Sequence, residues 1–226
     1  MIKYVNYSVF DTECDILVNT INCRGVMRAG IALEFALRYP KMHEDYIKDC
    51  DNGTIKTGQT YLYVCDGQKI LNFPTKDDYK APSLIEYLVE GLKFFSEHYK
   101  EYNAQSVAFP LLGCTNGGLD FEKEVKPIMF EYLSGIDMDV FICKNTLLMP
   151  ESVEARMLEK AKNTNAFQII SDLKLDNISI EKLSESIQAV DRFWKLSLSK
   201  MVGSKDNYIK LWNYFYLKIK GEHKYG

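Results

Sequence analysis

Two glycine-bearing loops follow short apolar runs, and their residue types suit the binding of phosphate groups. The first loop, Cys23–Gly30, comes after the run ILVNTIN, and the second, Gly113–Gly118, comes after VAFPLL. A strand that leads through such a loop into a helix presents backbone N–H groups to an anion at the helix N-terminus. One such loop would be a weak signal, because most glycine-rich turns bind nothing. Two of them predict a diphosphate held between the loops.

A lysine lies at the exit of another β-rich run, in the stretch Asn72-Phe73-Pro74-Thr75-Lys76. Pro74 is expected to end regular strand pairing, which would place Lys76 in the following loop. In open α/β sheets, ligands bind beyond the C-terminal ends of the strands. Because Asn22, Lys76 and the second glycine loop all follow such ends, we expect them to lie together.

The elements that position these residues alternate between strands and helices. Strands are expected over 1–9, 15–19, 60–65, 69–73, 107–110 and 139–143. Asp66-Gly67 predicts a hairpin between the third and fourth of them. Helices are expected from the first loop to about residue 50, from Ser83 with a capping box at Glu86, and from near Lys126 because Pro127 cannot lie inside a helix. The alternation predicts an α/β fold whose sheet is mixed, largely parallel and covered by helices.

Three apolar stripes at helical spacing predict packed helices rather than a cofactor site. The first accompanies the helix from Ser83, and the other two follow Pro150, after a helical segment over 151–163. We expect the last two to be amphipathic helices that pack on the main domain or on a partner chain. The members of the three stripes are Ile85, Leu88, Leu92, Phe95 and Tyr99; Ile180, Leu183, Ile187, Val190 and Trp194; and Tyr208, Trp212, Phe215 and Ile219.

Charge is distributed unevenly along the 226 residues. The net charge of −3 gives no global signal for nucleic acid, but residues 1–150 sum to −6 and residues 151–226 to +3. From Arg192 onward there are eight basic and two acidic residues. We favour a solvated helical tail; the alternative is a surface that faces a polyanion.

The cysteines and histidines indicate neither a metal site nor a catalytic triad. The six cysteines form no CxxC pair and do not cluster with the three histidines, so no zinc site or other metal is expected. The sequence shows no signal peptide and no long apolar span, which predicts a cytoplasmic protein with reduced thiols and no membrane contact. Cys23 and Cys114 are interpreted as packing residues rather than nucleophiles.

Three stretches taken together resemble the macrodomain family. They are VNTINCRGVMRAGIAL over 18–33, NFPTK with SLIEYLVEGL over 72–76 and 83–92, and AFPLLGCTNGGLD over 108–120. Within the family they are similar to the DarG-like branch of DNA ADP-ribosyl glycohydrolase antitoxins and terminal ADP-ribose protein glycohydrolases. The resemblance implies a macrodomain over 1–148, with helices on both faces of its sheet, and leaves 149–226 as a helical C-terminal extension.

The resemblance also implies roles for individual residues. Lys76 matches the catalytic lysine of this branch, and Asp120 matches an acidic residue used by the related protein glycohydrolases. Asn22 matches the asparagine near the distal ribose. Gly25–Gly30 and Gly113–Gly118 match the two phosphate loops. The expected ligand-binding residues are Ser8, Val9, Asn19, Asn22, Gly25, Val26, Met27, Arg28, Gly30, Ile31, Thr75, Leu112, Gly113, Cys114, Thr115, Asn116, Gly117, Gly118 and Leu119.

The chain departs from the family pattern at two of these positions. Arg28-Ala29 stands where the family usually has Gly-Lys, and Ser8 stands near the position where many macrodomains place an Asp or Asn that reads adenine. Purely structural interpretations also remain open: Asp120 as a helix N-cap, Asn22 as a turn residue and Lys76 as a surface lysine.

The activity that the resemblance implies is removal of thymidine-linked ADP-ribose from DNA. The reaction proceeds by attack at the anomeric carbon of the distal ribose and needs no cofactor. Lys76 can attack if it is partly neutral, which desolvation or Arg28 would favour and Asp77, Asp78 or Asp120 would oppose. The alternative is that Lys76 stays charged and stabilises the departing group. Implied partners are ADP-ribose, ADP-ribosylated DNA and a cognate ADP-ribosyltransferase toxin. The alternatives are a non-catalytic sensor or sponge for an NAD-derived nucleotide and an ADP-ribose-1″-phosphate phosphatase.

Overall fold

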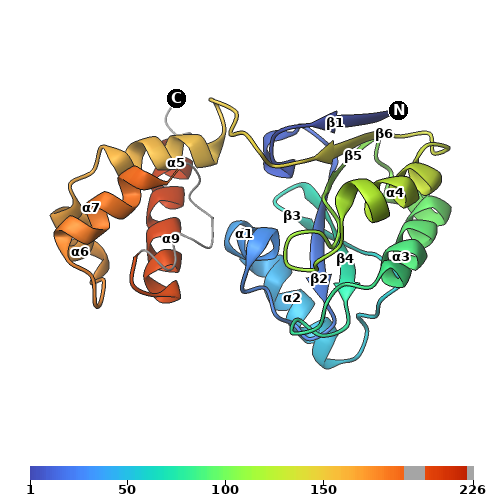
Figure 1. Cartoon of the computed structure of the whole chain (residues 1–226), viewed down its shortest axis with the longest axis horizontal. Helices are drawn as coiled ribbons and strands as arrows, with labels where there is room; N and C mark the ends of the chain where they lie inside the picture. Colours follow the sequence, from blue (N-terminus) through green and yellow to red (C-terminus); the bar gives the residue numbers. More distant parts are fainter. Residues whose placement is uncertain (191–201, 223–226) are drawn as a thin grey trace. The chain divides into compact units, whose positions relative to one another are not determined.

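The computed structural model describes residues 1–190 and 202–222 and divides the chain into two compact units, Met1–Leu147 and Leu148–Gly226 (Figure 1). The strands of the first unit are β1 (Ile2–Val5), β2 (Ile16–Asn22), β3 (Tyr61–Cys65), β4 (Gln68–Lys76), β5 (Ser106–Pro110) and β6 (Asp139–Cys143). Its helices are α1 (Gly30–Arg38), α2 (Pro40–Asp51), α3 (Ile85–His98) and α4 (Lys126–Leu133), with short helical turns η1 (Val9–Asp11), η2 (Tyr99–Tyr102) and η3 (Phe121–Val125).

The strands form one six-stranded sheet in the order β1-β6-β5-β2-β4-β3. All neighbouring pairs are parallel except β3 and β4, which form the predicted hairpin. Cys65 pairs with Gln68 across the turn, where Asp66 has φ 50° and Gly67 has φ 81°. Positive φ at both central residues is the geometry of a type I′ turn, which matches the twist of the strands. The predicted mixed, largely parallel sheet is therefore confirmed.

Helices cover both faces of the sheet, because successive side chains of its strands are buried on opposite sides. Ile16 and Val18 of β2 pack in a core with α3 and α4, whereas Leu17 packs in a second core with α1 and α2. Figure 1 shows α3 and α4 on one side of the sheet and α1 and α2 on the other. Alternation between two buried faces explains why β2 reads as a continuous apolar run.

Helix α3 can approach β4 closely because it carries a glycine at the contact. A Cβ atom added at Gly91 would lie 2.5 Å from the ring of Phe73, which is fully buried. All of the predicted stripe residues of this segment are buried except Ile85 at the start of the helix. The prediction that this stripe is core is confirmed for the other four.

The prediction that Pro74 ends β4 is wrong. Pairing with β2 continues past it, with Ile21 opposite Pro74 and Asn22 opposite Lys76 across an irregularity in register. On the other side of β4, β3 reaches only to Asn72. Beyond Asn72 the strand is therefore an edge on that side, where a residue without an N–H is tolerated. Lys76 is the last residue of β4 rather than a loop residue.

The predicted capping box at Ser83 is also wrong. Helix α3 begins at Ile85 with Leu84 at its N-cap, and no side chain bonds to the free N–H groups of the first turn. The backbone N–H of Ser83 instead donates to the carbonyl of Gly117 at 3.0 Å. The helical segment expected up to residue 50 is two helices that meet at Pro40, because proline starts a new helix more readily than it continues one. The predicted start near Lys126 is confirmed for α4.

The second unit is helical and has its own core. It contains α5 (Val153–Lys162), α6 (Ala166–Leu173), α7 (Ile180–Ala189) and α9 (Lys205–Glu222). The stripe Tyr208, Trp212, Phe215 and Ile219 on α9 is buried, as are Leu183, Ile187 and Val190, whereas Ile180 is exposed and Trp194 lies outside the described residues. Helix α5 packs against α7 and α9, so helices of the same unit cover these stripes.

Candidate functional site

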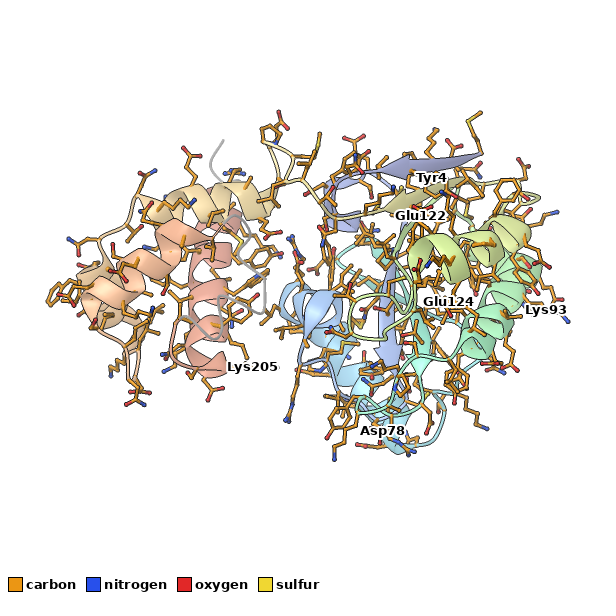
Figure 2. The ribbon with its side chains drawn as sticks, viewed as in Figure 1. Tyr4, Asp78, Lys93, Glu122, Glu124 and Lys205 are labelled. Carbon is orange, nitrogen blue, oxygen red and sulfur yellow. The ribbon has the colours of Figure 1, made fainter. Side chains whose placement is uncertain are left out.

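The candidate site lies at the C-terminal ends of β2, β4 and β5. Asn22 ends β2 and Lys76 ends β4, and the register of the parallel pair places them side by side. Strand β5 ends at Pro110 and leads into the second glycine loop. Asp78, labelled in Figure 2, marks this end of the sheet, toward which the β2 arrow points. The structure thus brings together the three features that the sequence placed at strand ends.

The first loop takes its shape from the side chain of Asn22. The Oδ1 atom accepts from the backbone N–H of Arg24 at 2.9 Å, and Nδ2 donates to the carbonyl of Val26 at 2.6 Å. From α2, the hydroxyl of Tyr46 donates to the carbonyl of Asn22 at 2.6 Å. Gly25 adopts φ +71°, a conformation that favours glycine. The turn interpretation of Asn22 therefore describes its contacts in this structure.

The two glycine loops meet where the first loop enters α1. Gly30 begins α1 with φ +56°, and a Cβ atom there would lie 2.8 Å from Nδ2 of Asn116 in the second loop. Ala29 at the N-cap offers no side-chain hydrogen bond, so the first N–H groups of α1, including that of Ile31, have no side-chain cap. Such free N–H groups attract anions. The arrangement suits a phosphate at the start of α1.

The second loop can exist only with glycines at its crowded positions. A Cβ atom at Gly117 would lie 2.1 Å from the carbonyl oxygen of Gly113 and 2.2 Å from Oγ of Ser83. Gly113 and Gly118 have φ of +66° and +86°. The N–H of Leu119 closes the loop by donating to the carbonyl of Gly113 at 3.2 Å. Thr115 and Asn116 remain exposed at its tip.

Lys76 is half-buried, and its Nζ donates to the carbonyl of Asn116 at 2.7 Å. Desolvation by burial lowers the pKa of Lys76 below its ordinary value. The neighbouring carboxylates that could oppose this are engaged with Arg24, whose guanidinium lies 2.9 Å from Oδ2 of Asp77 and 3.9 Å from Oδ2 of Asp78. Burial therefore decides the direction of the Lys76 pKa shift, which the sequence left open.

Asp120 is engaged as a helix cap. Its carboxylate accepts from the N–H of Lys123 at 3.0 Å, and Oε2 of Glu124 accepts from the N–H of Asp120 at 2.7 Å. Its other oxygen lies 4.0 Å from Nζ of Lys123. The N-cap interpretation accounts for these contacts fully, and a catalytic role for Asp120 stays a prediction.

Several expected ligand residues are buried in the structure. Asn19 is fully buried, and its Nδ2 donates to Oδ1 of Asn72 at 2.8 Å. Ser8 is buried, and its hydroxyl accepts from the N–H of Phe10 at 3.3 Å as the cap of η1. Buried with them are Val9, Met27, Thr75 and Leu112. Val26 is partly exposed in the first loop.

Arg28 has an exposed side chain, and among the described residues we find no ion pair for it.

The cysteines of the two loops lack the lowered pKa of a nucleophile. Burial raises the pKa of Cys23 to about 11 and that of Cys114 to about 11. Both are therefore neutral thiols near neutral pH, which agrees with their interpretation as packing residues.

Sequence reasoning missed the contacts of three residues that support the site. Tyr46 holds Asn22 from a helix far along the chain, and Ser83 holds the second loop although its sequence context predicts a helix cap. Arg24 could have been found, because a cation in the first loop and two carboxylates after Lys76 are complementary.

Metal sites and membrane-spanning helices are both absent from the described ranges 1–190 and 202–222. These residues contain no group of histidine, cysteine, aspartate and glutamate side chains arranged to hold a metal ion. In the same ranges, none of the helices combines the length and the apolar character that crossing a membrane requires.

Sequence comparisons identify related proteins. The Macro domain family matches residues 18–128. A DNA ADP-ribosyl glycohydrolase of Mycobacterium tuberculosis is 40% identical over 146 residues, which are 63% of this chain and 42% of that protein. A second one, of Thermus aquaticus, is 33% identical over 174 residues, 75% of this chain and 44% of that protein. A DNA ADP-ribosyl transferase-DNA ADP-ribosyl glycohydrolase fusion protein of Thermosipho africanus is 29% identical over 160 residues, 62% of this chain and 41% of that protein. The chain thus spans less than half the length of these relatives.

Solved structures extend the comparison to the fold. The macrodomain of Mycobacterium tuberculosis DarG superposes with a TM-score of 0.60 at 37% identity, covering 63% of this chain and 97% of that one. Thermosipho africanus DarTG in complex with ADP-ribose superposes with a TM-score of 0.60 at 28% identity, covering 67% of this chain and 42% of that one. With the six-stranded sheet and helices on both faces, these matches confirm the predicted fold: the chain belongs to the macrodomain family.

Proposed function

We propose that this protein is an ADP-ribosyl glycohydrolase that removes thymidine-linked ADP-ribose from DNA. The names of the related proteins support the reaction class, and the two glycine loops beside a half-buried lysine support the chemistry. The observation that carries the proposal is the position of Lys76. It ends β4 opposite Asn22, contacts the second glycine loop and has a lowered pKa.

In this proposal the diphosphate of ADP-ribose lies between the two glycine loops. The uncapped N-terminus of α1 at Gly30 and the peptide groups of Gly113–Gly118 would receive its oxygens. Arg28, exposed in the first loop, is placed to add a cation. This orientation would bring the distal ribose to the strand ends that carry Asn22 and Lys76.

The reaction requires the departure of a thymine base from the anomeric carbon through an oxocarbenium-like transition state. The neutral amine of Lys76 attacks this carbon, the glycosidic bond breaks and its electron pair leaves with the base, which is then protonated. Attack by water on the same carbon then releases ADP-ribose and restores the amine. A lysine with a lowered pKa suits this role, because a larger fraction is neutral near neutral pH.

The decisive experiment incubates the protein with thymidine-modified DNA, with ADP-ribosylated protein and with ADP-ribose-1″-phosphate. We expect release of ADP-ribose from the DNA and little turnover of the other two. Turnover of the 1″-phosphate alone would assign a phosphatase. Binding of ADP-ribose without turnover of any substrate would assign a sensor or sponge.

We also propose a cognate ADP-ribosyltransferase toxin as functional partner, in the role of an antitoxin that reverses its modification. The Thermosipho africanus relative, named as a transferase fused to a glycohydrolase, supports this pairing. A DNA substrate would place the protein in the cytoplasm. Co-expression with such a transferase should restore growth when Lys76 is present and fail to do so for Lys76→Ala.

A further inference from the structure

Ser83 carries a buried hydroxyl that the ligand-free fold does not use. The residue is 3% exposed, and its Oγ has no hydrogen-bond partner among the residues that the structure describes. Buried polar side-chain atoms are bonded in the large majority of cases, and an unbonded one costs stability. A residue that keeps such a group in place needs an explanation beyond packing.

Helix capping does not explain this hydroxyl. Ser83 lies before α3, where a serine would ordinarily accept from a free N–H of the first turn. The N-cap position is Leu84, and the first turn has no side-chain hydrogen bond. Only the backbone N–H of Ser83 is used, in its bond of 3.0 Å to the carbonyl of Gly117.

The hydroxyl points at the second glycine loop. Oγ lies 2.2 Å from the position that a Cβ atom of Gly117 would take and 3.2 Å from that of Gly113. Both glycines belong to the Gly113–Gly118 loop, so the hydroxyl touches the loop from its buried side. Because Oγ lies this close to both glycines, a loop peptide that turns toward it would form a hydrogen bond with it.

The segment from Lys76 to Ser83 is attached to this loop at both of its ends. Nζ of Lys76 donates to the carbonyl of Asn116 at 2.7 Å, and the N–H of Ser83 donates to the carbonyl of the next residue, Gly117, at 3.0 Å. Any rearrangement of these two peptides therefore acts on Lys76 and on Ser83 together.

We propose that Ser83 is a positioning residue whose hydroxyl hydrogen-bonds to a peptide group of the Gly113–Gly118 loop once a diphosphate is bound. The inference deepens the proposed function and rests on it. An anion recruits backbone N–H groups and turns the peptides of the loop. A ligand shifts a conformation only through contacts that differ between the two states. The Ser83 hydroxyl is such a contact, since it is unbonded in the ligand-free loop and bonded in the loaded one.

The test compares Ser83→Ala with the unaltered protein in thermal melting and in titration calorimetry with ADP-ribose. Removing an unbonded buried hydroxyl should leave Tm unchanged or raise it by about 2–4 °C. The same substitution should raise Kd for ADP-ribose by about tenfold, because the loaded loop loses a hydrogen bond to a buried group. A purely structural role would instead lower Tm whenever it weakened binding.

Ser106→Ala is the matched control. The hydroxyl of Ser106 donates to Oδ2 of Asp15 at 3.1 Å and accepts from the N–H of Asp15 at 3.0 Å, at the end of β5 away from the loops. Its removal should lower Tm and leave Kd unchanged.

Three results would contradict the proposal. A Kd of Ser83→Ala within twofold of the unaltered protein would show that the hydroxyl does not serve the loaded loop. A lowered Tm would show that it already contributes to the ligand-free fold. Absence of ADP-ribose binding by the unaltered protein would overturn the proposed function, and this inference with it; the first two results leave the proposed function standing.

Discussion

Lys76 is a strand residue whose side chain contacts the second glycine loop. The register of β4 with β2 fixes its backbone, and the Asn116 carbonyl holds its Nζ. Burial lowers the pKa of Lys76, and the adjacent carboxylates are occupied by Arg24. In the proposed mechanism, a reactive neutral amine depends on the desolvation of Lys76 and on Arg24, which pairs with the two nearby carboxylates, rather than on a dedicated general base.

We predict that Lys76→Ala lowers kcat on ADP-ribosylated DNA by about 10²–10⁴-fold. Affinity for ADP-ribose should stay within about tenfold, or roughly 1.4 kcal/mol, since the proposed contacts to the diphosphate come from backbone groups. Lys76→Arg should be equally inactive, because a guanidinium is always protonated. Lys80→Ala, an exposed lysine of the same connection, serves as control in the same assays. Parallel loss of affinity and turnover would make Lys76 a binding residue.

The pH dependence of kcat should reveal which form of Lys76 reacts. Because its folded-state pKa is lowered, the neutral amine forms as pH rises through a value below that of an ordinary lysine. We expect kcat to rise with pH and level off there, whereas a reacting ammonium would give a fall. Arg24→Gln should move the rise to higher pH, because Asp77 and Asp78 lose their cation and favour the charged amine. Lys123→Gln, which leaves these carboxylates paired, should not move it.

Sequence reasoning singled out Lys76 because its five-residue motif is contiguous; its catalytic role stays a prediction, and its expected place in a loop was wrong. It misplaced Ser83, because the pattern S-x-x-E is satisfied locally whereas the actual bond runs to Gly117, a contact that only the folded chain creates. Asp120 illustrates a third case. A capping residue before a helical turn explains it as well as chemistry does, and the structure shows the capping bonds.

At the scale of elements, the site depends on how closely three strand ends and two loops approach. Local turn chemistry predicted the β3–β4 hairpin, since Asp66 and Gly67 alone determine it. The length of β4 could not be predicted, because tolerance of Pro74 depends on β3 stopping at Asn72. The sequence shows which strand has a proline but not which of its edges is free.

Crowding in the second loop yields a prediction about Gly117. Gly117→Val should abolish ADP-ribose binding, because its Cβ would lie 2.1 Å from the carbonyl oxygen of Gly113 and force the loop open. Residues 113–118 take part in none of the strand pairings of the sheet, so circular dichroism should show an intact fold. Gly135→Ala is the control, since a Cβ there meets nothing within 4 Å. Binding retained by Gly117→Val would show that the diphosphate lies elsewhere.

At the scale of the whole molecule, each of the two units buries its own apolar residues. The stripe of α9, which was expected to pack on the main domain or on a partner chain, is covered by α5 and α6 of the same unit. The sequence showed the stripes but not the helices that cover them, because periodicity indicates which face of a helix is buried and not what buries it. Helix α6 was missed because its eight residues are too short for a clear period.

A protein cut after Leu148 should fold alone and bind ADP-ribose with a Kd within twofold of the full chain. The cut leaves intact the bonds from the N–H groups of Thr146 and Leu147 to the carbonyl of Asn6, at 3.2 and 2.6 Å. Cooperative melting and calorimetry would check this prediction. A cut after Asn145 removes both bonds and should lower Tm. Failure of the longer piece to fold would show that the helical unit is needed by the first.

The basic tail gives a separate prediction on DNA. Lys210 lies 4.0 Å from Asp176, Nζ of Lys218 donates to the hydroxyl of Tyr214, and the ammonium of Lys220 lies over the ring of Tyr216. Arg192, Lys195, Lys200 and Lys224 lie outside the described residues. Because Lys210, Lys218 and Lys220 already have partners, we expect the full chain and the piece that ends at Leu148 to bind single-stranded DNA with similar salt dependence. The slopes of log affinity against log salt concentration should agree within about 0.7, the value of one phosphate contact. A steeper slope for the full chain would assign the tail to nucleic acid.

The attachment of residues 76 and 83 to the neighbouring peptides 116 and 117 has a consequence for how such proteins diversify. With both ends tied, the chain between them can lengthen without displacing the lysine, and doubling a flexible loop costs only about 0.6 kcal/mol. Tyr79 and Lys80 already stand in this span, and Tyr79 is exposed. In the proposed site, new sequence inserted there would alter what the protein meets beside the ribose while Lys76 keeps its position. The span is therefore a natural place to graft new substrate recognition.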